Sequence, residues 1–110
     1  MNFPDQNIYI NLFSFLKLLM STPKHPASVE GYSGSLEDLA KAVGNMRYDC
    51  AAGLIDKLAD DIKQQADSDS ANGRTRLAGR LYSTAQELYL ARDGLLSAWE
   101  ICKPYMKDKE

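Results

Sequence analysis

Hydrophobic residues recur along the C-terminal part of the chain at alternating spacings of four and three residues. We call this series the leucine seam, and it consists of Leu77, Leu81, Thr84, Leu88, Ala91, Leu95, Ala98 and Cys102. A heptad register held over this length predicts a long helix that packs along a partner helix. We place this helix at about residues 74–103, because Pro104 would bend or end it.

A second long helix is predicted at about residues 36–66. Ser35 can cap its first turn, with Asp38 three residues later in a capping-box arrangement. The run 67–73 is rich in Asp, Ser, Asn and Gly and predicts a turn. Two long helices joined by a short turn predict an antiparallel helical hairpin. The apolar residues of this helix are Leu36, Leu39, Val43, Met46, Cys50, Leu54, Leu58 and Ile62.

The N-terminal part predicts a shorter and very apolar helix at about residues 5–21, followed by a linker at 22–34 with two prolines. Its apolar run covers only about 13 residues, whereas a membrane span needs about 20. A signal peptide would also carry basic residues before such a run. We therefore expect an all-α fold in a single domain, residues 1–110. The apolar helix packs on the hairpin as a three-helix bundle, and residues 104–110 form a tail.

Charged residues suggest a register for the hairpin. A turn centred near residue 70 places residues opposite each other when their numbers add up to about 140. In that register every facing charged pair is opposite in sign, which favours one orientation of the two helices. The pairs are Asp38 with Lys103, Lys41 with Glu100, Arg47 with Asp93, Asp49 with Arg92, and Asp60 and Asp61 with Arg80.

Overall composition argues against several classes of protein. Thirteen basic and fifteen acidic residues give a net charge of −2, whereas nucleic-acid binders normally carry a basic excess. The two cysteines, Cys50 and Cys102, make neither a disulfide framework nor a metal quartet. Reduced thiols without an export signal predict a cytoplasmic location.

No arrangement of residues predicts catalysis, a metal or a cofactor. The run that begins at Asp67 resembles a calcium loop, but Gly73 falls at its seventh position and Ala78 at its twelfth. An EF-hand needs glycine at the sixth position and glutamate at the twelfth. The acids Asp56, Asp60 and Asp61 lie one helical turn apart, without the Glu-x-x-His pairs of di-metal bundles. We therefore expect that the chain is not an enzyme.

Aromatic residues form a second stripe beside the leucine seam. Tyr82, Tyr89, Leu96 and Trp99 are its candidate partner-binding residues, because aromatic side chains dominate binding hot spots. At 1.5 Å per residue the N-terminal helix is about 24 Å long and the hairpin about 45 Å, so one helix cannot cover the groove. The pattern predicts a protein–protein interaction module, such as an adaptor, inhibitor or regulatory subunit. Its partner is a second copy, completing a helical bundle as a homodimer, or a different protein.

An alternative function is nucleic-acid or phosphate binding through Arg74, Arg76 and Arg80, near the start of the last helix. Helix N-termini and arginine side chains both favour phosphate. Neighbouring acids across the hairpin, including Asp67 and Asp69, would instead pair with these arginines and repel a phosphate backbone. The protein-binding hypothesis is therefore preferred.

Overall fold

The computed structural model describes residues 25–106, and the chain divides into two units, Met1–Ser35 and Leu36–Glu110. In the first unit, the described residues 25–35 form neither helix nor strand, in agreement with the predicted linker. The predicted helix at 5–21 lies outside the described residues. The three-helix bundle and the single-domain organisation therefore stay predictions.

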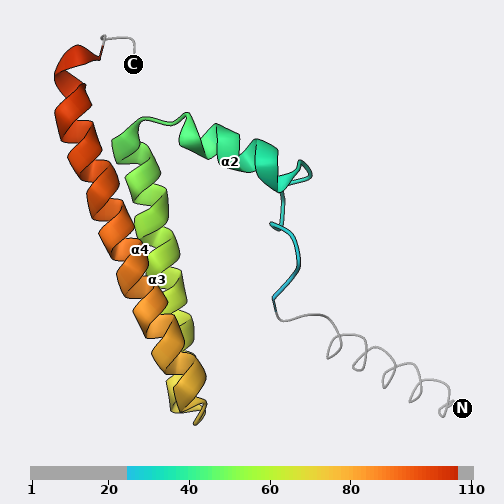
Figure 1. Ribbon diagram of the computed structural model, residues 1–110. Helices are drawn as coiled ribbons and strands as arrows, with labels where there is room; N and C mark the ends of the chain where they lie inside the picture. Colours follow the sequence, from blue (N-terminus) through green and yellow to red (C-terminus); the bar gives the residue numbers. More distant parts are fainter. Residues whose placement is uncertain (1–24, 107–110) are drawn as a thin grey trace, which may run out of the picture. The chain divides into compact units, whose positions relative to one another are not determined.

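The described part of the second unit is helical. It consists of α2 (Leu36–Gly44), α3 (Tyr48–Ala71), α4 (Thr75–Cys102) and the short 3-10 helix η1 (Lys103–Tyr105). Helices α3 and α4 pack against each other along their lengths as an antiparallel pair (Figure 1). The all-α prediction and the predicted hairpin are confirmed for this part of the chain.

The prediction of one continuous helix from 36 to 66 is wrong, because the chain leaves the helical path between α2 and α3. Gly44 ends α2, and the N–H of Asn45 still donates to the carbonyl of Lys41, at 3.0 Å. Arg47 is then extended, with φ −52° and ψ 145°. Glycine destabilises a helix relative to alanine and asparagine favours turns, so Gly44 followed by Asn45 favours a helix end at this point.

Arg47 also stabilises the new helix start. Its guanidinium donates to both carboxylate oxygens of Asp49, at 3.0 and 2.8 Å. This contact lowers the pKa of Asp49, because the hydrogen bonds favour the ionised carboxylate. A negative charge in the first turn also suits the helix dipole of α3.

The turn between α3 and α4 is shorter than the predicted run 67–73. Gly73 adopts φ +83°, and its N–H donates to the carbonyl of Ser70 at 3.1 Å. The N–H of Arg74 donates to the carbonyl of Asp69 at 2.8 Å, which completes a Schellman helix end. Only Asn72, Gly73 and Arg74 lie outside the two helices.

This longer α3 changes the pairing register of the hairpin. Asp56 contacts Arg92, so facing residues have numbers that add up to about 148 and not 140. The predicted register is therefore wrong, and with it the predicted charge pairs between α3 and α4. Those pairs were Arg47 with Asp93, Asp49 with Arg92, and Asp60 and Asp61 with Arg80.

Alanine makes up the whole buried core of the described residues. The buried side chains, all at most 5% exposed, are Ala51, Ala52, Ala59, Ala66, Ala78 and Ala85. Most of them recur every seven residues, so they form one line along α3 and a facing line along α4. Small side chains along both lines let the two backbones approach closely.

The leucine seam lies along the edge of the contact between α4 and α3, so the prediction that it forms the centre of that contact is wrong. Leu77 is 47% exposed, while Leu81, Leu88 and Leu95 are only half-buried. The buried positions of α4 are instead one residue further along, at Ala78 and Ala85. Close approach of two helices selects alanine at the contact and leaves the larger leucines beside it.

Substitution Ala59→Leu tests the close approach of the helices. Ala59 is 0% exposed, so a leucine there would force α3 and α4 apart. We expect it to lower the free energy of unfolding by about 1–3 kcal/mol, as overpacked cores usually do. Chemical denaturation measures this change. Ala71→Leu, at an exposed alanine of α3, is the matched control, with an expected change within about 0.5 kcal/mol. Equal effects of the two variants would contradict the alanine contact.

Candidate protein interface

The sequence around each buried alanine of α4 divides the hairpin into two faces. Ala78 is followed by Leu81 three residues later and by Tyr82 four residues later. The same order repeats one heptad further on, with Ala85, Leu88 and Tyr89. Positions three and four residues after a contact residue lie on opposite sides of the contact line. Leucines therefore line one face of α4 and tyrosines the other.

The tyrosine side, which we call the polar face, carries two matching hydrogen bonds between α3 and α4. The Tyr89 hydroxyl donates to the carboxylate of Asp60, and the Tyr82 hydroxyl donates to that of Asp67. The tyrosines are seven residues apart on α4, and the aspartates are seven apart on α3. The two bonds are therefore one repeated contact, which fixes the register of the hairpin on this side.

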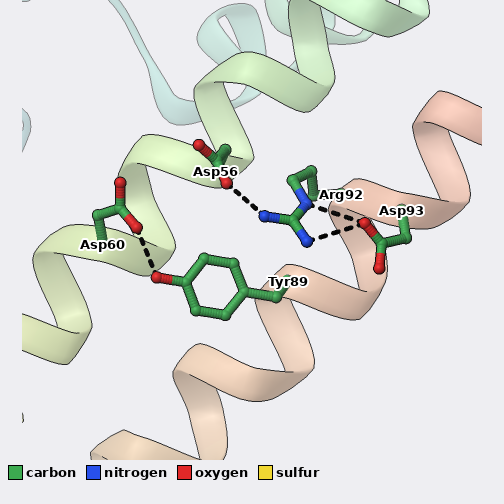
Figure 2. A network of polar contacts seen from close by, with 5 residues as sticks. All are labelled: Asp56, Asp60, Tyr89, Arg92 and Asp93. Atoms are coloured by element: carbon green, nitrogen blue, oxygen red, sulfur yellow. Dashed lines mark hydrogen bonds and ion pairs between the residues drawn. The ribbon is translucent and has the colours of Figure 1, made fainter.

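Arg92 extends this network by a third contact between the helices (Figure 2). Its guanidinium lies 2.6 Å from Asp56 on α3 and 2.9 Å from Asp93 on its own helix. The guanidinium carbon also lies 4.9 Å from the centre of the Tyr89 ring, a distance typical of a cation–π contact. Arg92 thus joins both aspartates to the ring whose hydroxyl binds Asp60.

Hydrogen bonding to aspartate changes the acidity of both tyrosines. The carboxylate of Asp67 raises the pKa of Tyr82, and that of Asp60 raises the pKa of Tyr89. In each case the hydrogen bond stabilises the neutral phenol, and partial burial raises the pKa further. Both hydroxyls therefore serve as donors in a structural contact, and the raised pKa values keep them protonated.

An open groove of about 400 Å³ lies beside this network. Its walls combine small residues of α3 with charged residues of both helices, namely Asp49, Ala52, Gly53, Asp56, Arg92, Asp93 and Leu96. The charged groups at the groove already have partners, because Arg92 contacts both Asp56 and Asp93 while Asp49 pairs with Arg47. The groove thus offers neither a nucleophile nor an unpaired acid or base.

Three of the predicted partner-binding residues, Tyr82, Tyr89 and Leu96, recur every seven residues along α4, while Trp99 continues the heptad spacing of Ala78 and Ala85. Tyr82 and Tyr89 are half-buried and bound to aspartates. Trp99 is half-buried beneath the guanidinium of Arg47, 5.0 Å from its ring centre. Leu96 is 41% exposed and lines the groove. Three of the four side chains thus hold the hairpin together, and their role in binding a partner stays a prediction.

Leucine and isoleucine side chains cover the opposite side of the hairpin, which we call the apolar face. On α3 its residues are Ile55, Leu58 and Ile62, and on α4 it is the leucine seam. Ile55 and Ile62 follow the buried Ala52 and Ala59 by three residues, just as the leucines follow the alanines of α4. Leu58 is 44% exposed, and Ile55 and Ile62 are only half-buried. Sequence patterns singled out Leu58, Ile62 and the leucine seam but not Ile55, and they did not show that buried alanines leave these side chains beside the contact and partly exposed.

The arginine cluster at the start of α4 is only partly paired. Arg74 contacts Asp69 at 2.7 Å, as the pairing alternative predicted. Arg76 and Arg80 are exposed and make no ion pair within residues 25–106. The anion-binding hypothesis stays a prediction for these two residues.

Acidic residues and cysteines form no metal site among the described residues, where no group of three or more potential ligands is suitably arranged. Asp61 accepts a hydrogen bond from Gln65 at 2.8 Å, while the neighbouring Asp60 binds Tyr89. Cys50 and Cys102 are both free thiols. Between residues 25 and 106, no helix is long and apolar enough to cross a membrane.

Comparison with known proteins adds no relative: no family model, curated protein or solved structure matches this chain. The properties of its two faces therefore carry the functional interpretation.

The raised tyrosine pKa values predict a loss of stability at high pH. Since the folded state favours the neutral phenols, their contribution is complete below the unfolded pKa of about 10 and is lost as the pH rises through the folded values. The free energy of unfolding should therefore fall above about pH 10. A Tyr82→Phe, Tyr89→Phe variant should show a shallower fall, measured by denaturant titration across that range. Tyr48→Phe is the control and should keep the steep fall. An unchanged slope in the double variant would contradict the assignment.

Proposed function

We propose that this chain is a small helical protein–protein interaction module that binds through the apolar face of its α3–α4 hairpin. An adaptor, an inhibitor or a regulatory subunit would each fit this description. The observation that carries the proposal is the alanine core, because it leaves the large apolar side chains of both helices outside the buried contact.

Continuity of the apolar face supports this proposal. Scattered exposed leucines are common on protein surfaces, but a contiguous apolar strip along two helices is typical of an interaction site. The leucine seam contains no charged residue over its whole length. A partner can therefore cover it without removing charges from water, which would otherwise oppose binding.

Differences between the two faces also support the choice of surface. On the polar face, both tyrosine hydroxyls and the guanidinium of Arg92 already have partners within the hairpin. Its groove is open and lined by three aspartates and one arginine, which give it a net negative charge. A partner gains more by covering the apolar face, where burial of leucine and isoleucine drives association.

Substitution Leu88→Glu tests the proposal. It places a charge at the middle of the apolar face and should weaken association by about tenfold or more, the usual loss at a binding hot spot. The assay captures proteins from a nuclease-treated lysate of the source cells, with an untagged copy of the chain co-expressed. Retention of that copy or of another protein is then compared between wild type and variant.

Leu90→Glu is the matched control for this experiment. Leu90 is 69% exposed and lies two residues further along α4, outside the leucine seam. The control should retain the same proteins as the wild type, and far-ultraviolet circular dichroism should show equal helix content in all three chains. The proposal is wrong if Leu88→Glu loses none of the retained proteins.

A further inference from the structure

We infer that the occupant of the apolar face is a second copy of this chain, bound antiparallel so that the two hairpins form a four-helix bundle. This inference rests on the proposed function and names its partner. In the dimer, α4 packs on α4 and α3 packs on α3 of the second copy, and the two Schellman turns lie at opposite ends.

The first support is the order of large and small residues in the leucine seam. An antiparallel pairing in which facing residue numbers add up to 179 places Leu88 opposite Ala91 of the second copy. The same pairing places Leu81 opposite Ala98. Because the pairing is symmetric, each contact occurs twice. A leucine thus meets an alanine at each of these positions, which is how layers of side chains interdigitate.

Both ends of the seam follow the same rule. Leu95 lies opposite Thr84 of the second copy, and Leu77 lies opposite Cys102. All eight seam residues are therefore matched, one large with one small, by a single register. The seam is complementary to itself, which is the property that a twofold interface requires.

The second support comes from α3. The midpoint of the leucine seam lies between residues 89 and 90, and the midpoint of Ile55, Leu58 and Ile62 lies between residues 58 and 59. Because Asp56 contacts Arg92, residues at the same level of α3 and α4 have numbers that add up to about 148. The two midpoints therefore lie at the same level of the hairpin. A single twofold axis at that level relates both helices to their copies and places Ile55 opposite Ile62.

The apolar N-terminal run fits this face less well. If helical, it would cover about 20 Å at 1.5 Å per residue, while the seam covers about 38 Å. Its apolar positions are also large throughout, at Ile8, Leu12, Phe15 and Leu19. These residues offer no series of small side chains to receive the leucines of α4.

Sedimentation of the purified full chain tests the oligomeric state. We expect a species of twice the 12.3 kDa chain mass at micromolar concentration. Substitutions in the leucine seam should change the dissociation constant of this dimer. Ala91→Leu should weaken the dimer at least about tenfold, because two leucines then meet. Exchanging the pair, with Leu88→Ala and Ala91→Leu together, should restore it in part. Ala91 is exposed within the chain, so its substitution leaves the hairpin itself unchanged.

Disulfide cross-linking tests the antiparallel geometry. In a Cys50→Ser background, Leu77→Cys should give a covalent dimer with diamide, through Cys102 of the second copy. Positions 77 and 102 are at opposite ends of one helix, about 38 Å apart, which is too far for a bond within the chain. Leu90→Cys in the same background is the control and should not cross-link, because Leu90 lies outside the seam.

Two results would overturn the inference. A monomer at all concentrations would leave residues 8–20 or a different protein as the occupant, and loss of that protein on Leu88→Glu would still support the proposed function. Cross-linking of the Cys50→Ser chain through Cys102 alone would indicate a parallel dimer and contradict the antiparallel register.

Discussion

The close contact between two lines of alanine is the constraint on which the rest of this hairpin depends. Ala59 and Ala66 on one helix and Ala78 and Ala85 on the other fill the buried contact, and their small side chains let the backbones approach closely. Every larger side chain must therefore lie to one side of the contact. A side chain three residues after an alanine lies on one side of the contact, and a side chain four residues after it lies on the other. This spacing separates an apolar face from a polar one.

Sequence patterns were sufficient to predict the helical class and the hairpin, but they assigned the wrong stripe of α4 to the contact. The leucine seam and the alanine line share the same heptad period, so periodicity cannot choose between them. Ranking by hydrophobicity prefers Leu81 and Leu88 over Ala78 and Ala85. The choice depends on the distance between the helices, which is a property of both helices together. The same heptad spacing was enough to single out Tyr82 and Tyr89. Their bonds to Asp60 and Asp67 depend on how the two helices pair and could not be predicted from spacing.

The helix boundaries show a similar division between local and non-local information. Gly44 followed by Asn45 is a local stop signal, but apolar spacing continues across it and favoured a single helix. The acidic run that includes Asp67 and Asp69 has the composition of a turn, yet it is helical. Its carboxylates are stabilised by Tyr82 and Arg74, which follow it on the other side of the turn. The pairing with Arg74 could be anticipated from the sequence, whereas the bond to Tyr82 becomes visible only once the register is known.

The Schellman turn at Gly73 does more than reverse the chain. Acids of α3 and alanines of both helices repeat every seven residues, so a hairpin slipped by one heptad would keep much of the same chemistry. Arg92, for example, would exchange Asp56 for Asp49 and still contact an acid. In that slipped register, however, Tyr89 would face Gly53 and lose its bond to Asp60, so the tyrosine contacts favour the observed register. Gly73, by fixing where α3 stops, favours the same register, so the turn and the tyrosine contacts select the same facing pairs of α3 and α4.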